Sequence, residues 1–409
     1  MIPLHRPAFG VGAVLAAALM PHRDAKSLQL CEAAHARASG CSEAVWLPSA
    51  RAGIGWALRA AIAPNTKVIG PAYTCSVVHE AMVRAGGKVQ IIDAAADSFA
   101  MHQESLQTAM TGAYALVLSE PFGHTYDLDW LAAASASAPC IRIVDSAMAV
   151  PQPELFQRLR GNDFAVVSFG AGKNSYAGWG AMGFTRDAAL ASRVRQLRDV
   201  MLMSGSFQLT ANRAAGITLR TAAQNPIVFS LTRKLWYQAR ALRSRQAAAS
   251  APQTIQSTPG FPPAWLDDST CSGEWRIPST RIDRGLSLKN LELAEAVRSK
   301  RVALARRYQT NLAAVAGVGC PPASSFALSH YTVRADARIR DRVKEELYRR
   351  GVYTISLWAF NEHLNPADFP NAHRLCGEVI CLPLSPWMNE AQVDAVCAKL
   401  KSVVAQVSA

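Results

Sequence analysis

The sequence predicts an α/β fold, in which a mostly parallel sheet carries helices on both faces and a smaller α+β domain follows. Three observations lead to this class. Apolar runs of strand length alternate with helical stretches from Lys67 to Asp145, a pattern typical of a parallel sheet. A glycine-rich turn joins two more apolar runs between Asp163 and Thr185. The last third opens with a long helical stretch and contains only short apolar runs.

Composition and charge restrict the classes of protein that fit this chain. It has 409 residues, of which 50% are hydrophobic and 18% are charged, so it can bury a large core. The formal net charge of +13 favours anionic ligands, such as a phosphorylated small molecule, an acidic partner or a membrane surface. Nucleic acid is not expected as a partner, because no recognised binding module is present. Nine cysteines without a C-x-x-C pair predict neither a disulfide framework nor a metal site, and are typical of a cytoplasmic protein.

The first 48 residues are expected to form two helices ahead of the sheet. The apolar run Phe9 to Met20 has only twelve residues and is too short to span a bilayer. A second helix is expected at Ser27 to Ala38, where apolar residues recur at helical spacing. The small residues Ser49 to Ala52 then open a helix that reaches Ile62. That helix start is either an anion site or an ordinary serine N-cap.

Strands and helices then alternate. Strands are expected at Lys67–Gly70, Val89–Asp93, Ala113–Ser119 and Cys140–Asp145, with helices at Ser76–Ala85, Glu104–Met110 and Asp127–Ser135. Ligands of such sheets gather at the carboxyl ends of the strands. Pro71 to Cys75, Asp145 and Lys173 all fall at ends of that kind.

A basic stretch separates the two parts of the chain. No acidic residue lies between Asp199 and Asp267, whereas seven basic residues do. The stretch is either a solvated basic face or an amphipathic surface that contacts a membrane or an acidic partner through residues 205–250. We therefore expect a large α/β domain at 1–199, a basic helical insertion with a linker at 200–266, and a small α+β domain at 267–409. The small domain is expected to open with a helix at Leu286–Ala314.

Lys173 is the residue that indicates chemistry. Lysine is rarely buried without a partner, yet Lys173 stands alone in a glycine-rich turn between two apolar strands. We interpret it as the lysine that forms a Schiff base with pyridoxal phosphate. This cofactor also needs a carboxylate at its ring nitrogen and a phosphate site. Asp145 lies 28 residues before Lys173 and Ser168 lies five residues before it, both in suitable places.

Other site types fit this turn poorly. A P-loop needs glycine at position 167 and serine or threonine after the lysine, but Val167 and Asn174 stand there. No G-x-G-x-x-G follows the first expected strand, and neither G-x-S-x-G nor H-E-x-x-H occurs. Dinucleotide-binding folds and two common hydrolase classes are therefore not expected.

The sequence resembles the DegT-type sugar aminotransferases, which are fold-type-I pyridoxal-phosphate enzymes. The resemblance covers nearly the whole chain except for about residues 200–266. Its motifs are the following segments: Ser168-Phe169-Gly170-Ala171-Gly172-Lys173-Asn174 with Gly178-Trp179-Gly180, Val144-Asp145-Ser146-Ala147, Pro71-Ala72-Tyr73-Thr74, Ser49 to Ala52, and Leu382-Pro383-Leu384-Ser385-Pro386.

This resemblance implies a role for each site residue. Lys173 would hold the cofactor and act in catalysis, and Asp145 would face the pyridine nitrogen. Ser168 with Ala50 and Arg51 would bind the phosphate. Cys75 stands where the family has an aromatic ring stacked on the cofactor, and Tyr73 is the expected substitute.

Three further positions concern the substrate side. Met148 replaces the family's histidine or glutamine, and Glu274 falls near the position of an asparagine supplied across the dimer. His124, which follows Gly123, is expected to touch the substrate.

The resemblance implies an aminotransferase that converts a keto group to an amine, on a nucleotide-linked keto-sugar with glutamate as amino donor. It also implies a cytoplasmic homodimer. Two alternatives stay open at this point. One is a pyridoxal-phosphate enzyme acting on a non-sugar natural-product intermediate, which Cys75 and Met148 suggest. The other is a non-catalytic, membrane-associated binding protein on the same fold.

Overall fold

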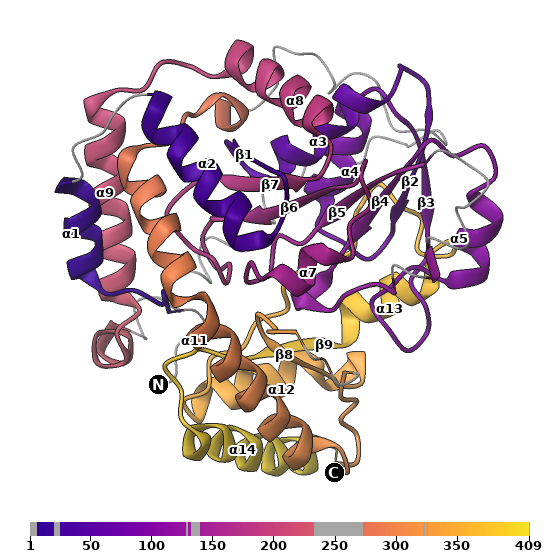
Figure 1. Cartoon of the computed structure of the whole chain (residues 1–409). Coiled ribbons are helices and arrows are strands. Elements are labelled where there is room, and N and C mark those ends of the chain that lie inside the picture. The colour runs from indigo at the N-terminus through magenta and orange to yellow at the C-terminus, as the bar shows by residue number, and fades with distance from the viewer. Residues whose placement is uncertain are drawn as a thin grey trace.

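A seven-stranded sheet forms the centre of the larger part of the molecule (Figure 1). The computed structural model describes residues 6–19, 25–127, 130–131, 140–232, 273–321, 324 and 326–408, and every number of strands or helices refers to these residues. The strand order is β1-β7-β6-β5-β4-β2-β3. The strands are β1 (Glu43–Leu47), β2 (Lys67–Pro71), β3 (Lys88–Ile92), β4 (Ala115–Ser119), β5 (Ile141–Asp145), β6 (Phe164–Ser168) and β7 (Ala181–Thr185).

The five strands from β6 to β3 run parallel, whereas β7 is antiparallel to both β6 and β1. The predicted mostly parallel α/β sheet is therefore confirmed. Because neighbouring parallel strands start and end together, Ser119 of β4, Asp145 of β5 and Ser168 of β6 reach the same edge of the sheet.

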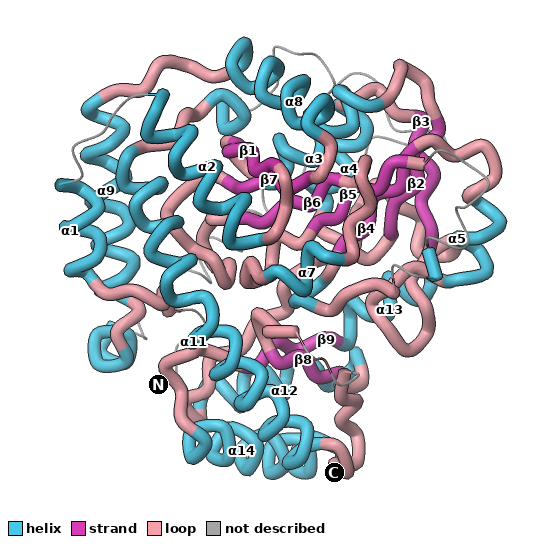
Figure 2. Tube along the Cα trace, in the orientation of Figure 1, coloured by secondary structure: helices cyan, strands magenta, loops and turns pink. Residues whose placement is uncertain are grey.

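Helices cover both faces of this sheet, as Figure 2 shows. Those of the larger part are α1 (Val11–Leu19), α2 (Ala25–Ser39), α3 (Ala50–Ala61), α4 (Ser76–Arg84), α5 (Gln103–Ala109), α7 (Pro153–Gln157), α8 (Ala188–Met201) and α9 (Phe207–Ala223). Side chains alternate between the two faces along each strand. Within β5, Ile143 packs into the layer of α3, α4 and α8, and Val144 packs into the layer of α2, α5 and α7.

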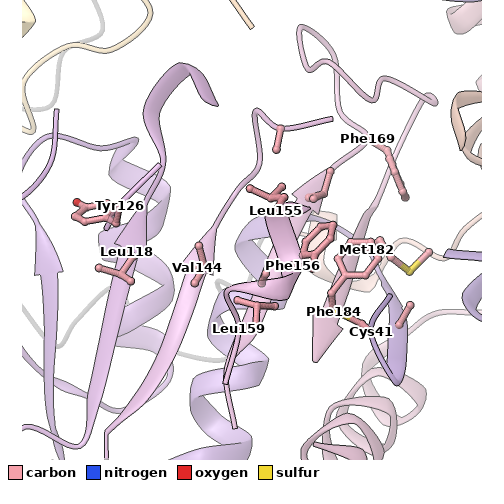
Figure 3. Packing of buried hydrophobic residues seen from close by; sticks show 14 of the residues in the cluster. Cys41, Leu118, Tyr126, Val144, Leu155, Phe156, Leu159, Phe169, Met182 and Phe184 are labelled. Atoms are coloured by element: carbon pink, nitrogen blue, oxygen red, sulfur yellow. The ribbon is translucent and has the colours of Figure 1, made fainter. Parts of the chain in front are cut away.

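The second of these layers is rich in aromatic residues (Figure 3). Phe156 of α7 packs against Phe184 of β7 with 4.4 Å between the ring centroids. Phe169, the first residue after β6, packs against Trp46 at 5.1 Å. The strand that leads into the Lys173 turn is thus fixed by aromatic packing on one face.

The smaller part of the molecule is built on a two-stranded antiparallel sheet, β8 (Tyr331–Arg334) with β9 (Val379–Leu382). Its helices are α11 (Arg281–Leu312), α12 (Ala337–Arg349), α13 (Pro370–Glu378) and α14 (Glu390–Ser408). The 32-residue helix α11 joins the two parts (Figure 1). Leu286 near its start lies in the core of the large sheet, and Tyr308 near its end lies in the core of the small part.

Two expectations about elements need correction. The edge strand β1 was not expected, because it is stabilised by distant pairing with β7 rather than by a local signal. Helix α11 begins at Arg281, not at Leu286, because Thr280 and Asp283 form a capping box one turn earlier.

Some expectations lie outside the described residues. They are most of the helix expected at 127–135 and the whole of 233–266. The division into three domains, with its two boundaries, stays a prediction. In the described part of the chain, no helix has both the length and the apolar character needed to cross a bilayer.

Candidate active site

The residues predicted for the cofactor site converge on one cavity with a volume of about 230 Å³. It lies where β4, β5 and β6 end and where α3 and α4 begin. Six predicted residues line it, namely Ala50, Arg51, Cys75, Asp145, Ser168 and Lys173. Tyr73 and His124 are not among the lining residues. Residues that are far apart in the sequence therefore form a single site.

Lys173 is presented by a tightly held turn after β6. Gly172 adopts a left-handed backbone with φ of 80°, which glycine tolerates without strain. The side chain of Asn174 donates to the carbonyl of Met148 at 2.7 Å, and Ser175 Oγ donates to the carbonyl of Ala149 at 3.1 Å. These bonds tie the turn to the segment that follows β5, so the lysine and Asp145 belong to one connected unit.

The amine of Lys173 points at a sulfur atom. Its Nζ donates to Met148 Sδ at 3.1 Å, and Met148 is buried and lines the cavity. A thioether is a weak acceptor that carries no charge. The amine is thus directed into the cavity by a contact that does not neutralise its charge.

The far side of the turn rests on Asp283 of α11. The backbone N–H of Trp179 donates to Asp283 Oδ1 at 3.1 Å. A Cβ on Gly178 would lie 2.6 Å from that oxygen, so only glycine allows this approach. Burial raises the pKa of Asp283 to about 6, although Arg213 and the bonds from Thr280 oppose the rise. Helix α11 therefore supports the lysine turn directly.

Asp145 ends β5 and faces the cavity. The N–H of Ala147 donates to its Oδ1 at 3.1 Å. Burial raises the pKa of this carboxyl above its usual range, Lys173 opposes the rise, and Glu120 adds to it. A group with a raised pKa in a cavity is typical of a functional site.

Glu120 is a second cavity-lining carboxylate, which the sequence did not single out. Arg158 Nη2 donates to its Oε1 at 2.7 Å, and Ser146 Oγ donates to its Oε2 at 2.6 Å. Both carboxylate oxygens of Glu120 therefore accept hydrogen bonds within the protein, unlike those of an unpaired carboxylate. Its only sequence signal was its position directly after β4, which it shares with many structural residues.

One end of the cavity can accept an anion. Ser49 caps α3, and its Oγ accepts from the N–H of Ala52 at 3.1 Å. The first N–H groups of a helix have no partners within it, so this end is electropositive. Ser168 Oγ accepts from the N–H of Gly170 at 3.2 Å, which leaves its own O–H for donation to a ligand. The N-cap and the anion site, which were alternatives in the sequence, are compatible in the structure.

The aromatic ring on the cavity wall is Trp358, which the sequence did not indicate. It comes from the smaller part of the molecule, near no recognisable motif. Tyr73, the expected stacking residue, is buried behind it with an edge-to-face contact at 5.3 Å. Phe122 stacks on Trp358 at 5.2 Å. Tyr73 thus supports an aromatic wall rather than lining the cavity, and Cys75 lines the cavity at the start of α4.

Of the two other substrate-side positions, His124 is not among the residues that line the cavity. His124 packs against Phe99 at 5.3 Å, and burial lowers the pKa of its imidazole to about 4. The side chain of Glu274 lies outside the described residues.

The chain matches the model of the DegT/DnrJ/EryC1/StrS aminotransferase family over residues 22–251 and 280–401. The chain belongs to this family. The resemblance that the sequence motifs indicate is therefore confirmed, and so is the prediction of an aminotransferase. The match also includes residues 200–251, which the predicted extent of the resemblance had left out.

Curated relatives are similar over most of their length. The chain is 27% identical to the erythromycin biosynthesis sensory transduction protein EryC1 of Saccharopolyspora erythraea, over 93% of this chain and 88% of that protein. It is 23% identical to the spore coat polysaccharide biosynthesis protein SpsC of Bacillus subtilis, over 89% and 86%.

Solved structures share the fold. The aminotransferase TlmJ of Streptoalloteichus hindustanus superposes with a TM-score of 0.72 at 21% identity, over the whole of both chains. The putative sugar aminotransferase Spr1654 of Streptococcus pneumoniae gives 0.70 in its PLP form, at 16% identity over 99% of each chain. Spr1654 is also known in a PMP form. With the family match, these structures bear out the prediction of a pyridoxal-phosphate cofactor.

Proposed function

We propose that this aminotransferase transfers an amino group from glutamate to the keto group of a nucleotide-linked keto-sugar. The observation that supports this most is the convergence of Lys173, Asp145, Ser168 and the start of α3 on one cavity. Together they supply the amine, the carboxylate and the phosphate site that pyridoxal phosphate requires.

The residues present fit the cofactor. The buried carboxylate of Asp145 suits a protonated ring nitrogen, because a nearby positive charge offsets the cost of its burial. The helix start at Ser49 and the O–H of Ser168 suit a phosphate. Trp358 and Val78 offer an apolar wall to a planar ring. When bound, pyridoxal phosphate withdraws electrons from the carbon that carries the amine.

The chain's own residues orient the reactants and move the proton. In the holoenzyme Lys173 Nζ, which contacts Met148 Sδ at the cavity, would take the proton from the α-carbon of the amino donor and would return it on the opposite side of the amine nitrogen. Asp145 would keep the ring nitrogen of the bound cofactor protonated. Trp358, Phe122 and Tyr73 form a packed aromatic wall that excludes water from this side of the cavity.

The size of the cavity bears on the substrate. A volume of about 230 Å³ is below the usual range for a drug-sized ligand. It suits one ring with a phosphate arm, so the nucleotide portion of a substrate would lie outside it. The net charge of +13 favours a diphosphate there. SpsC is named for polysaccharide biosynthesis, which also favours a sugar.

Half-reactions test this proposal. We expect glutamate to bleach the visible absorption of the purified holoenzyme, and a nucleotide-linked keto-sugar to restore it. Glutamine and aspartate serve as donor controls, and simple keto acids serve as acceptor controls. Recovery with keto acids but with no keto-sugar would overturn the sugar assignment and leave the aminotransferase chemistry intact.

A second candidate substrate class is a non-sugar natural-product intermediate. The contact between Met148 and Lys173 favours it, because a thioether offers a substrate hydroxyl no strong hydrogen bond. The same acceptor screen separates the two classes. The homodimer and the cytoplasmic location stay predictions, which sedimentation velocity and cell fractionation check.

A further inference from the structure

Trp358 reaches the cavity from a segment without regular secondary structure. The residue belongs to the smaller part of the molecule, and its ring packs against Phe122 at 5.2 Å and Tyr73 at 5.3 Å. Residues 356–361, all of which the structure describes, form neither helix nor strand. The position of the ring therefore depends on how the two ends of this segment are held.

The start of the segment is tied to the sheet of the smaller part. The N–H of Cys381 in β9 donates to the carbonyl of Ile355 at 2.8 Å. Ser356 Oγ donates to the carbonyl of Val379, also in β9, at 2.9 Å. These bonds fix where the segment leaves β9, but they do not join it to the larger part, where the cavity lies.

The far end of the segment is tied to the larger part through one imidazole. Asn361 Nδ2 lies 2.7 Å from His79 Nδ1, and His79 Nε2 lies 2.7 Å from the carbonyl oxygen of Pro71. His79 is a buried residue of α4, and Pro71 is the last residue of β2. The imidazole thus connects the smaller part to the strand that leads into Tyr73.

The direction of both bonds follows from the groups involved. A carbonyl oxygen only accepts, so the ring N–H of His79 is on Nε2, and Nδ1 accepts from the amide of Asn361. The N–H of His363 donates to Asn361 Oδ1 at 3.0 Å, which turns Nδ2 of that amide toward His79. Burial lowers the pKa of His79, although the bond to Pro71 opposes this change, and His363 adds to it. The neutral imidazole that both bonds require is therefore favoured.

A separate contact anchors the rest of the smaller part. Helix α13 begins without a side-chain cap of its own. Asp93, which follows β3 in the larger part, takes this role, because its carboxylate accepts from the N–H groups of Asn371 at 3.0 Å and Ala372 at 2.9 Å. The smaller part thus has an anchor that does not involve His79, and the bond to His79 acts on the segment that carries Trp358.

We propose that His79 is a positioning residue of the active site, which holds Trp358 on the cavity wall through its bond to Asn361. Neither His79 nor Asn361 is among the residues that line the cavity. His79 therefore acts through the ring of Trp358, which offers an apolar wall to the planar ring of the cofactor. The inference rests on the proposed function only in taking this cavity as the cofactor site.

Affinity for pyridoxal phosphate tests this inference. The cofactor is titrated into the cofactor-free full-length protein and followed by its visible absorption. His79→Gln keeps an amide near the position of Nε2, for the bond to Pro71, but loses the acceptor for Asn361. We expect His79→Gln and Asn361→Leu each to raise the Kd by about three- to tenfold, the value of one aromatic contact. His79→Asn keeps an acceptor near the position of Nδ1 and should bind the cofactor more tightly than His79→Gln.

Asn371→Ala is the matched control. Asn371 Nδ2 donates to the carbonyl of Ala94 at 3.0 Å, so this asparagine also joins the two parts of the molecule by a side-chain bond. Neither residue lines the cavity. We therefore expect the Kd of Asn371→Ala to equal that of the wild type.

A mutant cycle with Trp358 separates positioning from a general structural effect. In the Trp358→Ala background, His79→Gln should change the Kd by less than about twofold, because the ring through which His79 acts is gone. Fluorine NMR of the cofactor-free protein labelled with 5-fluorotryptophan gives a second readout. The resonance that is absent from Trp358→Phe belongs to Trp358, and it should move or broaden in His79→Gln and in Asn361→Leu.

Each outcome decides the proposal. Melting temperatures verify that the variants are folded, and Asn361→Leu decides alone if His79→Gln does not fold. Weaker binding that disappears in the Trp358→Ala background supports positioning. Equal weakening in both backgrounds, an unchanged Trp358 resonance, or the same loss in Asn371→Ala overturns it. Tighter binding by His79→Gln than by His79→Asn would also overturn it. Failure of glutamate or of every keto-sugar in the half-reactions would leave these results unaffected, because they involve no substrate.

Discussion

Each end of strands β5 and β6 carries one basic and one acidic residue. At the end where the strands start, the two side chains pair with each other, whereas at the end where the strands finish, both side chains face a cavity. At the starting end, Arg142 and Asp163 form a buried ion pair, in which Arg142 Nε donates to Asp163 Oδ1 at 2.9 Å. The N–H of Arg160 donates to the same carboxylate at 2.6 Å. At the finishing end, Lys173 and Asp145 line a cavity, and the lysine amine contacts the sulfur of Met148.

The two ends differ in whether the basic and the acidic side chain form an ion pair with each other. We call Arg142 and Asp163 the closed pair, and we call Lys173 and Asp145, which face the cavity, the open pair. A closed, hydrogen-bonded pair supports the fold, and removing one partner leaves the other charge buried alone. An open pair leaves both groups able to act on a ligand. Mutations at the starting end should therefore affect stability, and mutations at the finishing end should affect activity.

The largest effect on activity is expected at Lys173. Lys173→Ala should reduce the rate of the half-reaction by about 10²–10⁴-fold or more, because proton transfer loses its positioned amine. The melting temperature should change little, since the hydrogen-bond partner of the amine is the uncharged Met148 Sδ. Single-turnover kinetics and calorimetry measure the two quantities. A variant that keeps its activity would show that another group moves the proton.

The largest effect on stability is expected at the opposite end. Asp163→Ala should lower the free energy of unfolding by about 3–5 kcal/mol, because the buried guanidinium of Arg142 loses this carboxylate. Chemical denaturation of the wild type and the variant measures this. The double variant Arg142→Met with Asp163→Leu should recover much of the loss, and failure to recover any would contradict the assignment of a purely structural pair.

Asp145→Asn, at the finishing end of β5, should lower activity without lowering stability. We expect the half-reaction to slow by about 10²–10³-fold, the range found when a preorganised electrostatic contact is removed. Stability of the cofactor-free protein should not fall, since the neutral amide avoids the cost of burying a charge. Asp199→Asn is the control, because Asp199 lies on the surface away from the cavity. A large loss of stability in Asp145→Asn would place this residue with the closed pair.

The smallest expected effect is on the pH dependence of stability and of cofactor affinity. Burial raises the pKa of Asp145 in the folded state above its ordinary value of 3.8, so the folded cofactor-free protein binds a proton more tightly than the unfolded chain. Its contribution to stability is therefore present below 3.8 and is lost as pH rises through the folded pKa. Cofactor affinity should move the other way and fall with falling pH, because the ring nitrogen needs the carboxylate.

The measurement is the difference between the wild type and Asp145→Asn across about pH 4 to 7, for melting temperature and cofactor affinity. The difference in melting temperature between the two proteins and the difference in their cofactor affinity should change with pH in opposite directions, that is, with opposite signs. Equal signs would mean that Asp145 does not act on the ring nitrogen.

The residues that meet at the finishing end of the strands could be predicted from the sequence, for a physical reason. Asp145, Ser168 and Lys173 lie directly at the ends of strands or turns, so a strand pattern alone places them together. The helix start at Ser49 could be predicted because its cap is local. Sequence order and strand topology sufficed for these residues.

The remaining residues depend on distant packing. Trp358 reaches the cavity from the smaller part of the molecule, and no periodic pattern links it to Asp145. Glu120 and its partner Arg158 are 38 residues apart and are joined by a hydrogen bond that no local pattern indicates. Tyr73 was predicted on the cavity, but it lies behind Trp358 because of aromatic packing that the sequence does not contain.

The most direct test of the role assigned to Lys173 in the open pair is to determine which lysine of the chain carries the cofactor. The holoenzyme is reduced with borohydride and digested, and mass spectrometry locates the lysine that carries the reduced cofactor. We predict attachment at Lys173, with loss of the modified peptide in Lys173→Ala. Attachment at any other lysine, or none in a holoenzyme that shows the visible absorption, would contradict the assignment of this cavity as the active site.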